Sequence, residues 1–500
     1  MPTRRQIMQG LAAAGAALLP HAASPAAASE SFRLADWTGD SFAPMHAIRN
    51  GEWNKPLPKP EWRVEVAVVG GGLAGLTAAA MLDDLDLIVL EREAEPGGNA
   101  KAGVWRGIDY ALGSAYFVDI SEQYGKFYEK LGLALRPVTE PVDSMLTGAP
   151  HSPDALRGAL RRPFAQLRKH LAGIAASPDF PRIPIEEGTA AALALDSISF
   201  LDYLQRQHID PALFGLIDAY CYSSFGASAS AISAYAGINF YSEIAAPIYA
   251  FPGGNAVLAR AMAGRVERAG GGRLVTAAAV FAVEPAEDGL SRVGWFDAAK
   301  PGEPRCIAAR WVVVAAPFFF AGRILRGIKP EEAAAMTGLR QGSYLVANCC
   351  FEGQVTAPAY DSWTPGNPAF TDVIDAAAVL PAGARPATHG VLTVYAPFRD
   401  PAQGRTLLLE GDRAALANPI AAGLQRFLLD TLSGARLTEV RLTRWGHQHM
   451  IAQPGTVARM RRLPKRFGNV LLAHSDGQGM PAVESAIAEG LRAAAIIRGR

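Results

Sequence analysis

The spacing of apolar positions predicts a strand, a helix and a second strand that begin near residue 64. Residues Val64–Val69 form a β-branched apolar run, which is typical of a buried parallel strand. The pattern then predicts a helix from Leu73 to Asp83 and a second strand over Leu87–Leu90. This order of elements predicts an α/β fold.

The rest of the chain carries further helical and strand-like patterns. We expect helices over residues 121–133, 155–175, 200–220, 256–268 and 421–432. We expect strands over residues 273–283, 342–351 and 388–396. Small and aromatic residues are concentrated over 220–241, and this pattern fits either the lining of a substrate funnel or a buried helix.

Residues 29–61 are rich in tryptophan, proline and charge. Pro56, Pro58 and Pro60 exclude a helix or a central strand around them, because proline fixes φ and has no backbone N–H to donate. We therefore expect an extended N-terminal arm that packs through its tryptophans.

Residues 1–28 have the pattern of an export signal. Arg4 and Arg5 precede a weakly apolar stretch, Ile7–Leu19, and small residues form an A-x-A-like cleavage site before Ser29. The stretch is shorter than the ~20 residues of a membrane span. Twin arginine indicates a Tat-type signal and a periplasmic protein exported in the folded state. An alanine-rich amphipathic helix of a cytosolic protein is the alternative.

Composition excludes several classes of protein. Half of the 500 residues are hydrophobic, so the chain can bury a large core. A net charge of +1, from 48 basic and 47 acidic residues, argues against nucleic acid as a partner. The four cysteines show no CxxC or CxxCH spacing, and no metal site is expected. We expect a globular enzyme with no membrane span and a small-molecule substrate.

The first strand leads directly into a G-x-G-x-x-G motif. Gly70 allows a sharp turn, Gly72 allows the backbone to approach a pyrophosphate, and Gly75 allows the helix to pack on the strand. Glu91 follows the second strand, where a carboxylate can accept hydrogen bonds from ribose hydroxyls. The motif predicts a dinucleotide site formed by Gly70, Gly72, Leu73, Ala74, Gly75 and Glu91.

A second glycine pair follows the acidic residue. Glu91 and Arg92 are followed by Gly97, Gly98 and Asn99, and this spacing resembles the "acid, spacer, GG" signature of FAD-binding proteins of the amine oxidase superfamily. In that family the second loop also lies against the cofactor, and many members carry arginine where this chain has Asn99. No second G-x-G-x-x-G occurs, so FAD is favoured over an NAD-binding doubly wound fold.

The resemblance implies an interleaved architecture. A Rossmann-type FAD-binding domain would comprise residues 62–120, 250–320 and 440–500. A mixed α+β substrate domain would comprise residues 121–249 and 321–439.

Later segments match the family in order. Val280 falls where the family contacts the adenine end, and Trp311–Pro317 matches a strand that ends in proline. Asp476 takes the acidic position that reaches the ribityl chain. A C-terminal helix would point its start at the flavin through Met480, Pro481, Ala482 and Val483.

The family's amine-oxidising branch often uses a lysine near the flavin, and this chain lacks it. The matching strand has Val346 at that place, with Asn348 on the same face. Trp445, His447 and His449 precede the last flavin segment; in an extended chain both histidines would share a face. We predict Asn348, Trp445, His447 and His449 as catalytic candidates, the alternative for the histidines being hydrogen-bonded packing. These segments also resemble spermidine dehydrogenase-like proteins.

Three functions remain open from the sequence. The resemblance implies oxidation of an amine or polyamine by hydride transfer to flavin N5, with an electron-acceptor protein as partner since the lysine is absent. The aromatic segment at 220–241 would instead suit a flavin-dependent desaturase or isomerase of an apolar polyene or terpenoid. The third possible function is that of an exported, non-catalytic FAD-binding accessory protein.

Overall fold

The computed structural model describes residues 32–118, 122–138, 160–245, 247–270, 272–286, 288–428 and 434–499. The chain divides into two units, Met1–Phe32 and Arg33–Arg500. The predicted signal peptide at residues 1–28 lies outside the described residues, so the fold below is that of the second unit.

The first sheet contains the predicted strand–helix–strand unit. Its strands pair in the order β10-β4-β3-β13-β12-β11, and β20 pairs with both β13 and β19. Parallel pairing joins β10, β4, β3, β13 and β20, while β12 and β11 are antiparallel. The strands are β3 (Arg63–Val69), β4 (Leu87–Leu90), β10 (Gly272–Val275), β11 (Ala278–Pro285), β12 (Ser291–Asp297), β13 (Arg305–Val314), β19 (Arg466–Phe467) and β20 (Val470–Leu472).

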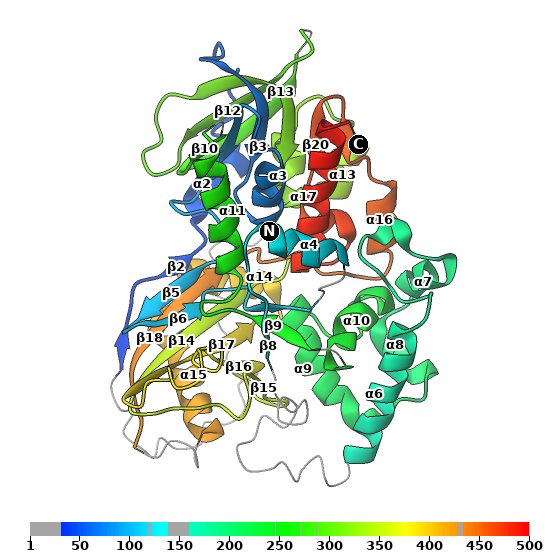
Figure 1. The fold of residues 1–500 in the computed structure, drawn as a ribbon, viewed down its shortest axis with the longest axis vertical. Coiled ribbons are helices and arrows are strands. Elements are labelled where there is room, and N and C mark those ends of the chain that lie inside the picture. The colour runs from blue at the N-terminus through cyan, green and yellow to red at the C-terminus, as the bar shows by residue number, and fades with distance from the viewer. Residues whose placement is uncertain are drawn as a thin grey trace, which may run out of the picture. The chain divides into compact units, whose positions relative to one another are not determined.

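Helices α3 (Leu73–Met81), α11 (Ala256–Arg268) and α17 (Val483–Ile497) lie together against this sheet (Figure 1). Alternate side chains of β3 point to opposite faces, so Val66 and Val68 join the core under these helices while Ala67 and Val69 join the core on the other face. The sheet is therefore covered on both faces, as parallel sheets require.

The second sheet pairs in the order β1-β18-β14-β17-β16-β15, and β2 also pairs with β18. Its strands come from three separated parts of the chain, so the two sheets are interleaved in sequence. They are β1 (Arg33–Leu34), β2 (Thr38–Gly39), β14 (Tyr344–Glu352), β15 (Asp361–Trp363), β16 (Asp372–Asp375), β17 (His389–Pro397) and β18 (Arg436–Trp445). The domain boundary predicted at residue 440 falls inside β18.

Smaller elements complete the described fold. Small strands are β5 (Ala102–Trp105), β6 (Ile108–Ala111), β7 (Tyr116–Phe117), β8 (Pro137–Val138) and β9 (Ile248–Ala250). The remaining described α-helices are α2 (Phe42–Arg49), α4 (Glu122–Lys130), α6 (Arg161–Ala175), α7 (Ala190–Ala194), α8 (Phe200–Arg206), α9 (Phe214–Phe225), α10 (Ala234–Tyr241), α12 (Phe318–Ile324), α13 (Pro330–Thr337), α14 (Pro401–Glu410), α15 (Arg413–Phe427) and α16 (Thr456–Arg462).

Two predicted elements are broken in the structure. The helix predicted over 200–220 splits into α8 and α9, because Pro211 cannot continue a helix and Asp210 caps the next turn by accepting from the Ala212 N–H. The strand predicted over 273–283 splits into β10 and β11 at Ala277, which has a φ of +52°. In both places the apolar pattern is continuous along the sequence, but the backbone conformation interrupts the element.

Two further predictions need correction in their limits. The helix expected at 421–432 starts at Arg413, because Asp412 caps it and the helix continues through Pro419. The arm predicted to be extended contains α2, which lies before its proline-rich part; Pro44 sits in the first helical turn, where a missing N–H costs no hydrogen bond. The expected tryptophan packing is present: the Trp53 ring stacks on Phe296 with centroids 3.7 Å apart.

The aromatic segment at 220–241 lies in the core. Tyr220, Phe225, Tyr235 and Tyr241 are each at most 1% exposed and belong to the same buried cluster as α6 and α8. The buried-helix alternative therefore holds for this segment.

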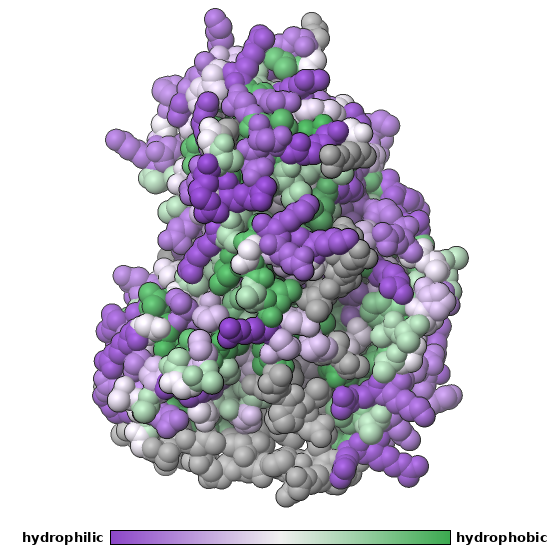
Figure 2. All heavy atoms as spheres, viewed as in Figure 1, coloured by the Kyte–Doolittle hydropathy of each residue, from purple (hydrophilic) through white to green (hydrophobic). Residues whose placement is uncertain are grey.

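The surface is largely hydrophilic over the first sheet, and hydrophobic residues gather between the two sheets on the face shown in Figure 2. Among the described residues, Val104 and Leu409 are the large hydrophobic side chains classed as exposed. No helix in the described part of the chain is long and apolar enough to cross a membrane. Cys221, Cys306, Cys349 and Cys350 are all buried and unpaired.

Candidate FAD and substrate site

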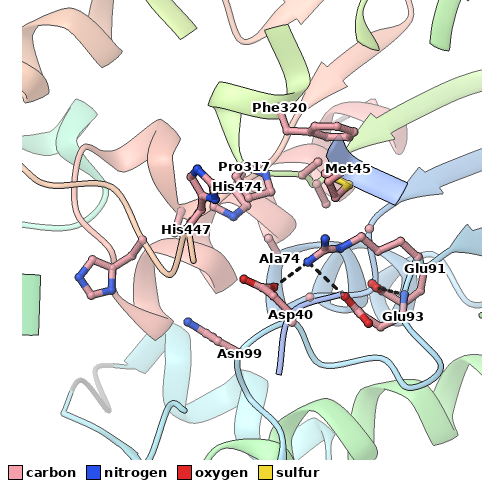
Figure 3. Close-up of a pocket in the computed structure, with 18 of the residues that line it drawn as sticks. Asp40, Met45, Ala74, Glu91, Glu93, Asn99, Pro317, Phe320, His447 and His474 are labelled. Carbon is pink, nitrogen blue, oxygen red and sulfur yellow. Dashed lines mark hydrogen bonds and ion pairs between the residues drawn. The ribbon is translucent and has the colours of Figure 1, made fainter. Parts of the chain in front are cut away.

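A cavity of about 320 Å³ opens at the carboxyl ends of the parallel strands of the first sheet (Figure 3). Val69 and Gly70 follow from β3, Leu90 and Glu91 from β4, and Ala315 from β13. Ligands of doubly wound folds bind at this edge, where the loops after the strands diverge. Residues of the arm and of the end of β18 close the other walls.

Two glycine loops form one wall of the cavity by packing backbone against backbone. Gly72 and Gly97 form an isolated β-bridge, and a Cβ on Gly98 would lie 3.3 Å from the Gly72 Cα. Gly70, with a φ of +104°, makes the predicted turn. A Cβ on Gly75 would lie 2.0 Å from the Gly70 carbonyl oxygen, so Gly75 permits helix packing without lining the cavity.

Glu91 lies at the cavity wall and is tied to the glycine loop. Its carboxylate accepts the Gly71 N–H at 2.6 Å and the Glu93 N–H at 2.9 Å, and the residue is 6% exposed. Each carboxylate oxygen has a second lone pair, so both can still accept a hydroxyl. The geometry therefore allows Glu91 to bind the ribose hydroxyls, and this role stays a prediction.

An ion-pair cluster adjoins Glu91. The Arg92 guanidinium lies 2.8 Å from the Asp40 carboxylate and 3.3 Å from Glu93. Burial acts to lower the pKa of Arg92, but Asp40 and Glu93 outweigh it and raise that pKa. Burial raises the pKa of Asp40, and Arg92 only partly offsets this. Sequence patterns did not indicate Asp40, which comes from the arm.

Two helix starts also meet the cavity. Helix α3 begins there with Leu73 and Ala74, and α17 begins there with Pro481, Ala482 and Val483. Neither N-terminus has a side-chain cap, so its first N–H groups and positive dipole end are available to an anionic group.

The remaining wall comes from the segments after β18 and β20 and from α12. Trp445 ends β18 and donates its indole N–H to the Leu112 carbonyl at 2.8 Å. His447 and His449 both line the cavity, but the chain turns after Trp445, so the shared face expected of an extended chain is wrong. The His447 ring stacks on Phe319 at 4.7 Å, whereas His449 lies against Tyr344 at 5.5 Å.

Both histidines are neutral near pH 7. Burial lowers the pKa of His447 to about 4, with Arg405 adding to the effect. Burial lowers the pKa of His449 to about 4, and a hydrogen bond to the Phe225 backbone opposes this only in part. The Nε2 of His449 is buried without a hydrogen-bond partner in the described part of the chain, as is Oε1 of the neighbouring Gln448.

Asn348 was predicted as a catalytic candidate, and the structure removes it from the cavity. It is fully buried in the middle of β14, where its Oδ1 accepts from the Thr393 hydroxyl at 2.7 Å. The strand runs away from the cavity after Tyr344, so a residue four positions on cannot reach it.

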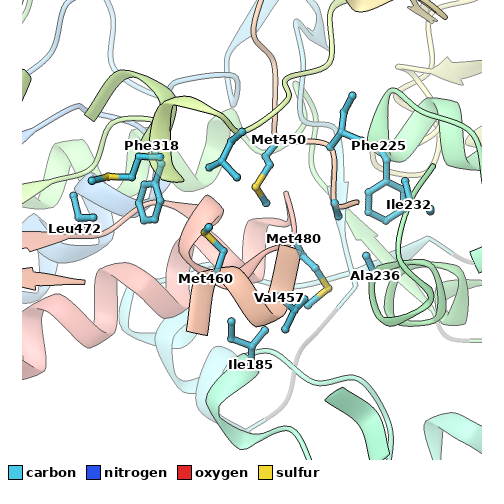
Figure 4. Packing of buried hydrophobic residues seen from close by; sticks show 14 of the residues in the cluster. Ile185, Phe225, Ile232, Ala236, Phe318, Met450, Val457, Met460, Leu472 and Met480 are labelled. Carbon is cyan, nitrogen blue, oxygen red and sulfur yellow. The ribbon is translucent and has the colours of Figure 1, made fainter. Parts of the chain in front are cut away.

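Asp476 and Met480 were predicted to contact the cofactor, and neither lines the cavity. Asp476 accepts the Phe318 N–H at 2.8 Å and pairs with His474 at 3.3 Å. Burial acts to raise the pKa of Asp476, but the His474 contacts outweigh it and lower that pKa. Met480 packs in the buried core beside Val457 (Figure 4). Within this segment His474 and Ser475 line the cavity instead.

Most predicted cofactor residues are brought together at the cavity. The lining includes Gly70, Gly72, Leu73, Ala74, Glu91, Arg92, Gly97, Gly98, Asn99, Val280, Pro481, Ala482 and Val483. The sequence did not predict the lining residues of the arm or Phe319, Phe320 and Arg323 of α12, because no local motif marks them. The only sequence feature that points to α12 is the family-like proline that precedes it. No cluster of three metal-ligating side chains occurs among the described residues.

Comparison with known proteins identifies the family and its cofactor. The profile of the family described as flavin containing amine oxidoreductase matches residues 73–498. The chain belongs to this family. It is an FAD-dependent oxidoreductase, so the predicted cofactor and enzyme class are confirmed. No curated protein matches the chain.

Solved structures support the fold of this flavin oxidoreductase. Cyclohexylamine oxidase from Brevibacterium oxydans is similar with a TM-score of 0.63 and 19% identity, covering 87% of this chain and 99% of that one. Putrescine oxidase, in a structure bound to putrescine, is similar with a TM-score of 0.62 and 15% identity, covering 88% and 99%. The Rossmann-type FAD-binding domain with a substrate domain is confirmed.

The residues of the cavity fit FAD. The glycine loops form one wall of backbone atoms without side chains. The uncapped N-termini of α3 and α17 suit the phosphates and the reduced flavin. The Glu91 carboxylate suits the ribose hydroxyls. Asn99 lines the cavity at the place where many family members carry arginine.

Proposed function

We propose that this flavin oxidoreductase oxidises an amine, with removal of a hydride from the carbon next to nitrogen. The observation that carries the proposal is that Gln448 and His449 line the FAD cavity, while Oε1 of Gln448 and Nε2 of His449 are buried with no partner in the described part of the chain. A buried polar atom without a partner is costly, and a bound ligand can satisfy it.

These acceptors suit the N–H groups of an amine. His449 Nε2 has no partner in the described part of the chain, and a neutral imidazole ring carries one acceptor nitrogen. A neutral imidazole does not repel a cationic amine as an imidazolium would. Trp445 provides an adjacent apolar wall.

FAD, when bound, supplies the two-electron acceptor for the hydride. The protein's part is to hold the reacting carbon at about 3–3.5 Å from its acceptor and to exclude water. Gln448 and His449 would orient the nitrogen, and His447, packed on Phe319, would support the same wall.

We place polyamines first among the substrates. The support is the similarity of the segments around Trp445 and His474 to spermidine dehydrogenase-like proteins, together with the putrescine bound by one structural neighbour. The aromatic segment 220–241 lies in the core and contributes no residue to the cavity in the described part of the chain, so it offers no argument for an apolar polyene substrate.

We also propose an electron-acceptor protein in place of oxygen and a periplasmic location. The support for the first is that no lysine is among the described residues that line the cavity. The support for the second is the twin-arginine segment at residues 1–28. Rapid reoxidation of the reduced protein by air would contradict the proposed acceptor protein. Retention of residues 1–28 in the mature protein in its native host would contradict the proposed periplasmic location.

The test is anaerobic bleaching of the bound flavin. The purified holoprotein should lose its flavin absorbance with at least one polyamine, diamine or monoamine, and not with polyene lipids. Bleaching by lipids alone would overturn the proposal, and so would no bleaching by any amine.

Two variants make this test specific to the site. Gln448→Leu and His449→Leu should each slow flavin reduction by about 10²-fold, because orienting contacts of this kind are worth a few kcal/mol. Asn348→Ala is the matched control, since Asn348 is buried outside the cavity. Equal effects in all three variants would contradict the assignment.

A further inference from the structure

The arm, residues 33–61, lies outside the stretch matched by the family profile, which begins at residue 73. It nevertheless contributes Asp40, Phe42, Met45, His46 and Arg49 to the wall of the FAD cavity. These residues form a part of the cavity wall that lies before the matched stretch.

The arm is first held by the second sheet. Strands β1 and β2 run parallel to β18, and the Asp40 N–H donates to the Arg444 carbonyl at 2.9 Å. The Thr38 and Thr443 hydroxyls are 2.7 Å apart. The arm therefore enters the cavity region from the substrate side of the molecule.

The arm next crosses to the first sheet and holds the loop after β4. Asp40 pairs with Arg92, and the Ser41 N–H and hydroxyl donate to the two carboxylate oxygens of Glu93 at 3.1 and 2.5 Å. Arg92 in turn donates to the Ser41 carbonyl at 3.2 Å. This loop carries Glu91, so the arm fixes the residues beside the predicted ribose position.

Helix α2 then covers the cavity. It has eight residues, and Ser41 at its start binds Glu93 and does not cap the helix. Helices of this length are marginal on their own in water, so α2 depends on what it packs against. Ala47 and Ile48 pack near Phe281 of β11. Met45 lines the cavity (Figure 3) and is only half-buried.

The arm brings both a carboxylate and a guanidinium to this end of the cavity. Asp40 is paired with Arg92, whereas Arg49 of α2 and Arg323 of α12 line the cavity and form no ion pair within the described part of the chain. Asn99 is uncharged. Arg49 and Arg323 are therefore the lining cations that can still meet an anionic group of a ligand.

We propose that the arm is a cofactor-binding element that covers the adenosine diphosphate half of FAD, and that its docking and FAD binding stabilise each other. The position of α2 indicates which half of FAD the arm covers. Helix α2 lies beside the loop that carries Glu91 and beside β11, whose Ala278, Ala279 and Val280 line the same cavity. The coupling follows from linkage, because a ligand that contacts only the docked arm must favour docking.

Hydrogen–deuterium exchange of the full chain after removal of flavin tests the coupling. Addition of FAD should slow exchange of the amides of residues 42–49 by about tenfold, and ADP should do the same while FMN does not. Amides of β15 and β16, which are remote from the cavity, serve as the reference for general stabilisation. Unchanged exchange with FAD, or protection by FMN but not by ADP, would overturn the proposal.

A pair of variants on α2 tests the binding surface. Met45→Asp puts a carboxylate into the cavity, and the Kd for FAD, measured by flavin fluorescence, should rise about tenfold or more. Ala43→Asp adds the same charge to the same helix at an exposed position outside the cavity lining, and should change the Kd less than twofold. Equal Kd values for both variants and the parent protein would refute a binding role for the arm.

Discussion

The Asp40 carboxylate and the Arg92 guanidinium are 2.8 Å apart, and they join the arm, which precedes the stretch matched by the family profile, to the loop after β4. The Asp40 carboxylate also accepts the Gly446 N–H at 3.1 Å. One side chain therefore connects the arm, the loop after β4 and the turn after β18, which belong to three different parts of the chain. Such a contact stabilises the closed cavity as a whole.

Loss of this carboxylate should destabilise the fold. Asp40→Ala leaves Arg92 partly unpaired in a buried place, and we expect the free energy of unfolding to fall by about 2–4 kcal/mol in urea titrations. Asp36→Ala is the control on the same arm, because Asp36 is fully exposed where it pairs with Arg413, and its loss should leave the free energy of unfolding nearly unchanged. Similar losses in both variants would contradict the importance of the Asp40 pair.

Substitutions of two glycines in the same motif should separate cofactor binding from folding. A Cβ at Gly72 meets nothing closer than the Gly98 Cα at 3.9 Å, so Gly72→Ala should fold normally and lose FAD, because the methyl group enters the cavity. Gly75→Ala meets the Gly70 carbonyl oxygen at 2.0 Å and should destabilise the protein by about 1–3 kcal/mol. Flavin content and Tm, measured on both variants, check this; a Gly72→Ala protein that retains full FAD would contradict it.

The cavity histidines should make the protein sensitive to acid. The folded-state pKa of His449 is about 4, below its unfolded value of about 6.5, so the unfolded state binds the proton first. Stability from this group is present above pH 6.5 and is lost as pH falls toward 4. His449→Gln should therefore make the slope of unfolding free energy between pH 6.5 and 4 shallower by about 1 kcal/mol per pH unit. An unchanged slope would show that His449 is not buried as a neutral group.

A buried carboxyl group in the second sheet should act in the opposite direction. Burial raises the pKa of Asp372 to about 6, while its hydrogen bond from the Thr371 hydroxyl at 2.5 Å opposes the shift. The folded state therefore binds the proton more tightly, so stability is greatest below pH 3.8 and is lost as pH rises through 6. Asp372→Asn, which cannot ionise, should lose less stability than the parent between pH 4 and 7. Asp297→Asn, at an exposed site, is the control, and a parent-like profile for Asp372→Asn would contradict the assignment.

Local patterns predicted the parts of the site that are built from contiguous residues. The strand over Leu87–Leu90 and the helix over Ala256–Arg268 are observed with the predicted limits, because apolar periodicity is a property of neighbouring residues. The glycine motif was also predicted correctly at the cavity, because it too is made of neighbouring residues. One short loop provides the sharp turn, the backbone that can approach a pyrophosphate and the start of the helix.

Predictions that depended on distant packing were less successful. Asn348 was chosen from its place on a strand, but only the register of β14 against β18 shows that the cavity ends near Tyr344. Asp476 was chosen from its place in the C-terminal segment that resembles the family, but its carboxylate accepts the N–H of Phe318, 158 residues earlier. A carboxylate's role depends on which donors surround it, and a single sequence does not reveal them.

The sequence by itself determined the family, the FAD cofactor and the strand–glycine–helix unit, because each rests on residues close together in the chain. Only the tertiary structure decided that the arm lines the cavity, that Gln448 and His449 line it with buried polar atoms that have no partner in the described part of the chain, and that the aromatic segment packs in the core. The physical reason is that short-range order follows from local conformational preference and periodicity, whereas burial and pairing depend on which distant surfaces meet.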